Sequence, residues 1–177
     1  SLDILRAHEQ IFEDKVRFIL ELPDLPLRDA FEQGPEEFMH RLDYSTYVQT
    51  PSMRSEAYQE LESSGRLALL RDSRLRNAIA STHNDYRSTQ PVFVDPIGDY
   101  RRLLFETLPG RSYYDYRVGA VAADTAAVLA SVDEFRNDPR FEPAANAEVT
   151  YGSDALFYMR EFRQRYEEIL SLLQAGE

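Results

Sequence analysis

Residues 153–173 read SDALFYMREFRQRYEEILSLL, and this stretch decides the fold. Its apolar side chains recur every three or four residues, whereas charged and amide side chains occupy the opposite face. This spacing predicts a long helix that packs as a member of the core. The apolar face consists of Leu156, Met159, Phe162, Tyr166, Ile169, Leu170 and Leu173.

Similar stripes elsewhere in the chain predict further helices that are joined by short, proline-containing loops. The first is a long helix over residues 2–21, which Pro23 and Pro26 end. The less regular segment 27–50 predicts one or two short helices around Pro35. The remaining helices are expected at 52–64, 73–86, 95–108 and 113–138, and residues 139–151 are expected to form a loop.

A turn is expected between helices 52–64 and 73–86. Gly65 has the position of a left-handed residue that ends a helix, and Asp72 or Ser73 can cap the next one. The leucines between them are too few for a helix of their own. We expect a buried connector made by Leu67, Leu69 and Leu70.

The composition favours a single folded domain. The chain has 177 residues, 43% of them hydrophobic and 21 of them Phe or Tyr, which suffices for a sizeable core. Its 7 Gly and 9 Pro fall mostly between the apolar-periodic segments. Composition and periodicity together predict one all-α domain over residues 1–177, an antiparallel bundle of five to seven helices with long first and last helices.

The net charge of −11 argues against two classes of partner. Binding to phosphate backbones requires a clustered positive field, so we expect no nucleic acid. Anionic lipid surfaces would repel the chain as well.

The absence of cysteine excludes disulfides, thiolate nucleophiles and cysteine-ligated metals. No stretch reaches the roughly 18 to 20 apolar residues that cross a bilayer. Because the chain starts at Ser1 without a methionine, we expect any membrane segment to lie outside it.

No catalytic motif supports an enzyme. HEQIF, residues 8–12, fails as a zinc motif because Phe12 stands where the second histidine would be. Adjacent acids on a helix diverge by about 100° and form no acid–base pair. Glycine-rich phosphate loops and the GxSxG motif are absent from the sequence. We expect no catalytic residue, no metal and no cofactor, and we interpret His83 as a hydrogen-bonded histidine at the core margin.

An arginine group is the first candidate binding site. Arg71 and Arg74 flank the expected start of the helix over 73–86, where free N–H groups and the helix dipole favour a small anion. The alternative is that these arginines, with Arg66 and Arg76, pair with the acidic residues Glu60, Glu62 and Asp72.

A tyrosine group is the second candidate. Tyr113 and Tyr116 lie close to Arg111 and could line a pocket that has an apolar body and polar tips. The alternative is aromatic filling between helices, with the phenol groups reaching water.

Residues 57–79, AYQELESSGRLALLRDSRLRNAI, resemble a bacterial family of unknown function. Its members usually carry one N-terminal transmembrane helix followed by a helical soluble domain. The resemblance implies that residues 2–21 continue a juxtamembrane helix. It also implies, by the positive-inside tendency, a periplasmic or otherwise extracytoplasmic domain that a segment absent from this chain anchors to the inner membrane.

Two functions fit these expectations best. The first is an extracytoplasmic sensor or small-ligand-binding module of a membrane-anchored protein. The second is a non-enzymatic interaction or assembly scaffold of the cell envelope, for example as a homodimer.

Overall fold

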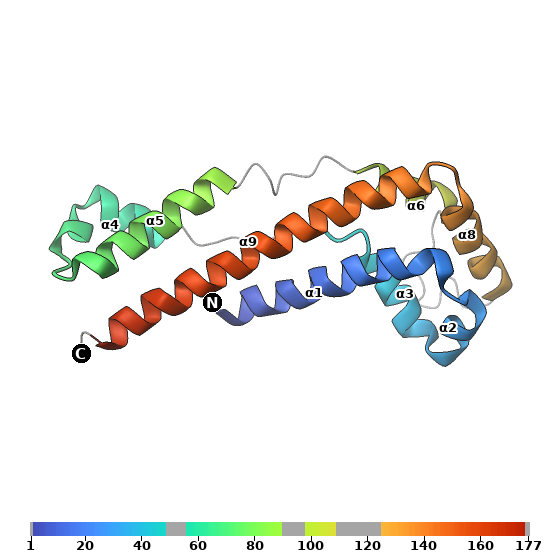
Figure 1. Cartoon of the computed structure of the whole chain (residues 1–177), viewed down its shortest axis with the longest axis horizontal. Coiled ribbons are helices and arrows are strands. Elements are labelled where there is room, and N and C mark those ends of the chain that lie inside the picture. The colour runs from blue at the N-terminus through green and yellow to red at the C-terminus, as the bar shows by residue number, and fades with distance from the viewer. Residues whose placement is uncertain (1, 49–55, 90–97, 109–124, 176–177) are drawn as a thin grey trace. The chain divides into compact units, whose positions relative to one another are not determined.

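The computed structural model describes residues 2–48, 56–89, 98–108 and 125–175, and every regular element in these ranges is helical (Figure 1). This confirms the all-α class, and the 20 residues of α1 and 35 of α9 confirm the long first and last helices. The described part holds eight α-helices, against five to seven expected, partly because the segment around Pro35 forms two. These helices are α1 (Leu2–Glu21), α2 (Leu27–Gln33), α3 (Pro35–Tyr44), α4 (Glu56–Ser63), α5 (Ser73–Thr89), α6 (Asp99–Thr107), α8 (Thr125–Asn137) and α9 (Phe141–Ala175).

Packing contacts group the chain into two compact units. Unit 1 consists of residues 1–10, 49–94 and 155–177, and unit 2 of residues 11–48 and 95–154. Each unit therefore contains part of α1 and part of α9. The interpretation of residues 1–177 as one domain stays a prediction.

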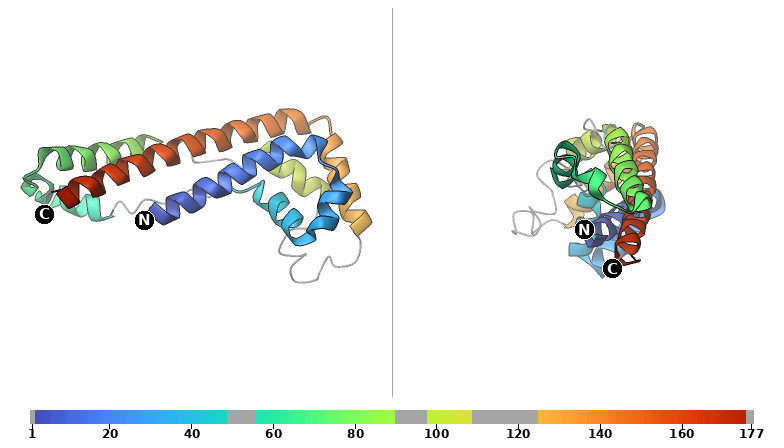
Figure 2. Two further views of the ribbon diagram at one scale, coloured as in Figure 1. Left: turned by 60° about the horizontal axis from the view of Figure 1, so that its bottom comes forward. Right: turned by 90° about the vertical axis from the view of Figure 1, so that its left-hand side faces the viewer.

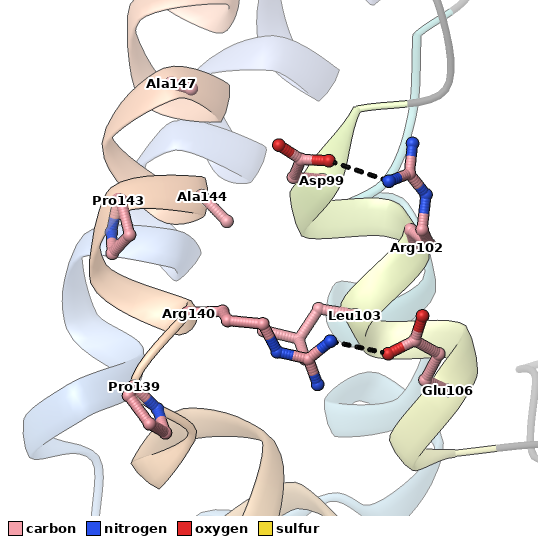
Figure 3. Close-up of a pocket in the computed structure, with 9 residues that line it drawn as sticks. All are labelled: Asp99, Arg102, Leu103, Glu106, Pro139, Arg140, Pro143, Ala144 and Ala147. Carbon is pink, nitrogen blue, oxygen red and sulfur yellow. Dashed lines mark hydrogen bonds and ion pairs between the residues drawn. The ribbon is translucent and has the colours of Figure 1, made fainter.

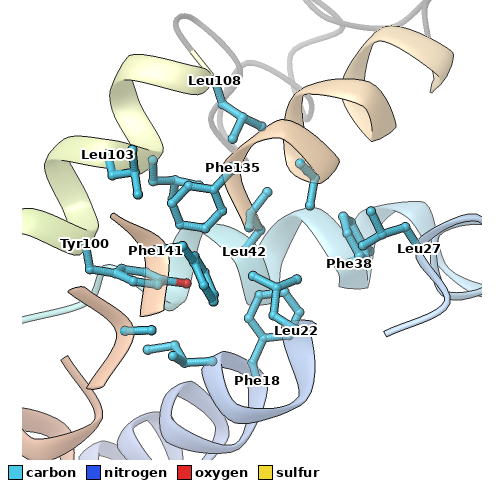
Figure 4. Packing of buried hydrophobic residues seen from close by; sticks show 14 of the residues in the cluster. Phe18, Leu22, Leu27, Phe38, Leu42, Tyr100, Leu103, Leu108, Phe135 and Phe141 are labelled. Carbon is cyan, nitrogen blue, oxygen red and sulfur yellow. The ribbon is translucent and has the colours of Figure 1, made fainter. Parts of the chain in front are cut away.

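Aromatic rings form the centre of unit 2 (Figure 4). Phe135 meets Tyr100 and Phe141 edge-on, with ring centroids 5.3 and 5.1 Å apart. Phe38 makes the same kind of contact with Phe18, at 6.2 Å. Such pairs add to the roughly 1.5–3 kcal/mol that burying each large apolar side chain contributes. The buried cluster consists of Phe18, Ile19, Leu22, Leu27, Phe31, Phe38, Met39, Leu42, Tyr100, Leu103, Leu104, Leu108, Val128, Val132, Phe135, Phe141, Ala144 and Ala145.

The end of α1 follows the expected proline signal. A short 3-10 turn, η1 (Leu22–Asp24), replaces the α-helix where Pro23 enters the chain. The Arg136 guanidinium of α8 donates hydrogen bonds to the carbonyls of Leu22, Pro23 and Leu25, at 3.4, 3.3 and 2.8 Å. These bonds satisfy carbonyl groups that a helix leaves open at its end.

The expected loop over residues 139–151 is wrong, because α9 begins at Phe141 and runs through this segment. Just before α9 begins, the carboxylate of Asp138 accepts the N–H of Arg140 at 2.8 Å. Pro143 is the third residue of the helix, where a missing N–H leaves no intrahelical hydrogen bond unmade.

Gly152 also lies inside α9, although the sequence suggested a helix start just after it. A Cβ atom at this position would lie 2.7 Å from Cγ2 of Val16 on α1. The glycine is therefore a consequence of close helix approach in unit 2, not a signal that ends a helix.

Unit 1 contains a hairpin of α4 and α5 beside the C-terminal part of α9 (Figure 2). Gly65 turns the chain with a φ of 70°, which confirms the left-handed helix end. The Asp72 carboxylate accepts the N–H of Arg74 at 2.8 Å and thus caps α5, as expected. Tyr86 of α5 packs edge-on against Phe162 of α9, with centroids 5.7 Å apart.

The buried leucine connector is wrong. Residues Arg66–Leu69 form a 3-10 turn, η2, with no buried side chain, and Leu69 is 77% exposed. This turn packs mainly against α4, which leaves Leu67 and Leu70 half-buried and Leu69 exposed.

His83 of α5 is buried, as the sequence indicated, but the expected hydrogen bond is not found. Neither ring nitrogen has a hydrogen-bond partner in the described part of the chain. The ring instead stacks on Tyr58 of α4, at 3.8 Å between centroids.

Candidate functional site

The only lysine of the chain is buried in unit 2 together with a carboxylate. Lys15 of α1 is 1% exposed and Glu148 of α9 is 4% exposed. The ammonium group donates to the Glu148 carboxylate and, at 2.6 Å, to the carbonyl of Tyr47. Burying two charges costs several kcal/mol per ion in desolvation, which good geometry must offset.

Two aromatic rings complete the surroundings of the lysine. Its Nζ atom lies 5.4 Å from the ring centre of Phe12 and 5.2 Å from that of Tyr151. Ring faces attract cations, and more strongly where water is excluded. The Tyr151 hydroxyl donates to the carbonyl of Val48 at 3.2 Å, which holds the segment after α3 against α9.

A second buried polar group lies between α3 and α6. Tyr100 is fully buried, and its hydroxyl donates to Oγ of Ser45 at 3.2 Å. The Ser45 hydroxyl donates in turn to the carbonyl of Leu42 at 2.6 Å. Burial raises the pKa of Tyr100 far above its usual range, while the hydrogen bond with Ser45 acts in the opposite direction. The phenol therefore stays neutral, and its role is to pack and hydrogen-bond within the core.

Three neighbouring rings lie at the end of α3 and in the segment that follows it, of which Tyr44 and Tyr47 are stacked. His40 lies 4.1 Å from Tyr44, and Tyr44 lies 5.5 Å from Tyr47 with the two rings almost parallel. Burial, and to a lesser degree the neighbouring Tyr44, raises the pKa of the Tyr47 phenol. Burial likewise raises the pKa of Asp43, against the positive field of His40 and Arg101.

A hollow of about 240 Å³ lies beside these rings, and we call it the α1–α3 groove. Arg17 on its rim pairs with Asp14, one turn back on the same helix. Arg41 pairs with Glu21 at 2.8 Å and lies 4.8 Å from the ring centre of Phe18. The lining holds three basic and two acidic side chains, and consists of Ile11, Asp14, Lys15, Arg17, Glu37, His40, Arg41 and Tyr44.

A larger hollow of about 450 Å³ lies between α6 and the start of α9 (Figure 3). Arg102 pairs with Asp99 at 3.1 Å, and Arg140 pairs with Glu106 and Asp138, both at 2.9 Å. Each guanidinium pairs with a carboxylate, and the lining holds two acidic and two basic side chains. The α1–α3 groove, with three basic and two acidic side chains, has the more positive lining of the two hollows.

The structure describes only some of the predicted site residues. Arg71 and Arg74 are exposed near the start of α5, where the Asp72 carboxylate already accepts the N–H groups of Arg74 and Leu75. An external anion would compete with this cap. Arg111, Tyr113 and Tyr116 lie outside the described residues.

Sequence reasoning missed Lys15 and Glu148. A signal existed, because a single lysine among 19 arginines lies one turn from Phe12 on the apolar side of α1. No signal pointed to Glu148, because residues 139–151 were interpreted as a loop.

Metal binding and membrane insertion find no support in the described ranges. No group of three or more His, Asp or Glu side chains there could hold a metal ion. None of the helices described combines the length and apolar composition that crossing a bilayer requires.

Comparisons with protein-family models, with curated proteins and with solved structures find no match to this chain. The resemblance of residues 57–79 to a membrane-anchored family thus stays a prediction.

Proposed function

We propose that this chain is a helical ligand-binding module that takes a small anionic molecule in the α1–α3 groove. The observation that carries the proposal is the lining of this groove, which brings Arg17 and Arg41 together with the rings of His40 and Tyr44. Pockets that fix small molecules combine apolar or aromatic walls with a few charged groups. With about 240 Å³, the groove suits a small carboxylate, sulfate or phosphate compound.

The same groove supports a sensor. Four residues of α1 line the groove, and one of them, Lys15, is bound to Glu148 of α9 and to the Tyr47 carbonyl. An anion that draws Arg17 away from Asp14 changes the field acting on the neighbouring Lys15. A ligand shifts a conformational equilibrium only through such a difference in interaction.

Placement in the cell is part of this proposal. The resemblance of residues 57–79 supports an extracytoplasmic domain that a segment outside this chain anchors to the inner membrane. No catalytic residue and no cofactor enter the proposal.

A thermal-shift titration with phosphate, sulfate, acetate and benzoate tests it. A ligand at about 100 times its Kd stabilises the folded state by roughly 2.7 kcal/mol, which is a readily measured rise in Tm. Arg17→Gln should abolish the rise. Arg102→Gln is the matched control, since Arg17 and Arg102 are 60% and 61% exposed and both pair with an aspartate three residues before.

Two results would refute the anion site. The first is that none of the four anions raises the Tm of the wild type. The second is that Arg17→Gln and Arg102→Gln reduce the rise equally, because the effect would then be a general response to salt.

An interaction scaffold is the second candidate, and one observation favours it. Five of the seven large hydrophobic side chains exposed in the described ranges belong to unit 1. Concentrated apolar exposure marks interaction surfaces. A scaffold would ignore the anions and associate instead, which sedimentation at increasing concentration measures. The five residues are Ile4, Leu69, Phe157, Leu170 and Leu173.

A further inference from the structure

The charges that line the α1–α3 groove balance once Lys15 is counted with its buried partner. The Lys15 ammonium binds the Glu148 carboxylate, and neither side chain is more than 5% exposed. Two basic and two acidic side chains then remain in the lining, besides the ring of His40. They are Arg17, Arg41, Asp14 and Glu37. Because complementary charge favours a partner, such a lining fits a ligand that carries both signs better than it fits a dianion.

Arg41 is the best-placed group of the groove for a carboxylate. Its side chain is 27% exposed, and its guanidinium lies 4.8 Å from the ring centre of Phe18. The Nη2 atom donates to the Glu21 carboxylate at 2.8 Å, and the described ranges show no other hydrogen bond of this guanidinium. A guanidinium carries five N–H groups in a fixed fork. Arg41 is therefore held in place and still has donors for a second carboxylate.

Glu37 is the acid of the groove that has no ion pair with any residue that the structure describes. Asp14 already pairs with Arg17, one turn further along the same helix. Glu37 lies in the first turn of α3, one turn before Arg41, yet Arg41 pairs with Glu21 instead. The exposed Glu37 carboxylate is thus the one that an ammonium group in the groove can pair with.

The apolar part of the lining is small. It consists of Ile11 and the rings of His40 and Tyr44, all of them half-buried. Ligand pockets combine such apolar surface with a few polar groups that fix orientation. Within about 240 Å³, this surface suits a compact apolar group next to the two charged ends of a ligand.

We infer that the anion taken by this groove is the carboxylate of a zwitterion, namely an amino acid with an apolar side chain. Arg41 and Arg17 hold its carboxylate, and Glu37 pairs with its ammonium group. The side chain of the amino acid lies against the apolar part of the lining. This inference rests on the proposed function, because it keeps the carboxylate subsite and adds a subsite for a cation.

Three compounds built on the same phenylethyl group separate the two subsites. Phenylalanine carries both charges, 3-phenylpropionate carries only the carboxylate, and 2-phenylethylamine carries only the ammonium group. Isothermal titration calorimetry at neutral pH measures the dissociation constant of each compound. We expect phenylalanine to bind about threefold more tightly than 3-phenylpropionate, since exposed ion pairs contribute a factor of up to roughly five. Because it makes no charge-assisted hydrogen bond to a guanidinium, 2-phenylethylamine should bind at least about tenfold more weakly than phenylalanine.

Glu37→Gln removes the charge that pairs with the ammonium group. In this variant phenylalanine and 3-phenylpropionate should bind about equally, and 3-phenylpropionate should bind no more weakly than it binds the wild type. Glu36→Gln is the matched control, because Glu36 is the neighbouring exposed acid in the first turn of α3 and lies outside the lining of the groove. The control should keep the wild-type preference for phenylalanine.

The outcomes separate this inference from the proposed function. If the wild type bound 3-phenylpropionate as tightly as phenylalanine, or if Glu37→Gln and Glu36→Gln kept the same preference, the zwitterion would be overturned and the carboxylate site would stand. If 2-phenylethylamine bound as tightly as phenylalanine, the carboxylate would contribute nothing and the inference would be overturned as well. If neither phenylalanine nor 3-phenylpropionate bound, the inference would fall together with the carboxylate site.

Discussion

The buried pair of Lys15 and Glu148 gives the sharpest prediction about this molecule. Lys15→Met removes the cation and leaves a carboxylate that is 4% exposed, without another ion pair in the described part of the chain. Breaking a buried pair by removing one partner typically costs about 3–5 kcal/mol. Since domains are stable by roughly 5–15 kcal/mol, we expect this variant to lose about a fifth or more of its stability.

The two single variants should differ. In Glu148→Gln the ammonium keeps the Tyr47 carbonyl at 2.6 Å and the ring faces of Phe12 and Tyr151. The amide oxygen can accept one further hydrogen bond. We therefore expect a smaller loss, about 1–3 kcal/mol. The double variant Lys15→Met, Glu148→Leu leaves no buried charge and should lie within about 1 kcal/mol of the wild type.

Urea unfolding followed by far-ultraviolet circular dichroism measures these losses, and a double-mutant cycle gives the coupling energy. Arg17→Met is the control, because Arg17 also pairs with an acid but is 60% exposed. Exposed pairs contribute roughly 0–1 kcal/mol. If Lys15→Met cost no more than Arg17→Met, the account of Lys15 as a desolvated, paired cation would be refuted.

Two further predictions concern α9. Gly152→Ala should destabilise the folded state by about 1–3 kcal/mol, partly offset by the higher helix propensity of alanine, because the added Cβ meets Val16. An additional Val16→Ala should relieve the clash. The control Ser153→Ala, at an exposed position, should show no loss in Tm. Hydrogen bonds from Arg140 lower the pKa of Asp138, so the stabilisation is present at neutral pH and is lost as pH falls below the usual aspartate value. The Tm deficit of Asp138→Ala should therefore shrink between pH 7 and pH 3, and a deficit that stayed constant would contradict this role.

Much of the fold could be predicted because the apolar residues that become buried recur in the sequence at the helical period. In α9 the stripe found from the sequence is buried at Leu156, Met159 and Phe162. In α8 the valines and Phe135 recur on one buried face, also as expected. The helix ends could be predicted equally well, because Asp72 and Gly65 act on the neighbouring backbone and need no partner distant in sequence.

The predictions that failed share a physical cause. Each concerns residues whose surroundings are set by a partner distant in sequence. Gly152 looks like a helix breaker until Val16 is placed against it. Leu69 looks like a core residue, but nothing in the sequence says that its turn leaves the side chain exposed. The α1–α3 groove was missed for the same reason, because Arg17 and His40 come together only through tertiary packing.

Two neighbouring positions on the buried face of α9 show what such distant partners contribute. Glu148 must meet Lys15, and Gly152 must meet Val16, so a slip of α1 along α9 would bury an unpaired charge and drive a side chain into Val16 or its neighbours. An apolar pair in place of Lys15 and Glu148 would tolerate the slip. Polar residues in helix–helix contacts are known to fix register at a cost in stability. We therefore expect the double variant Lys15→Met, Glu148→Leu to match the wild type in urea yet exchange its α1 amide hydrogens faster, and equal exchange would show that the pair contributes no register.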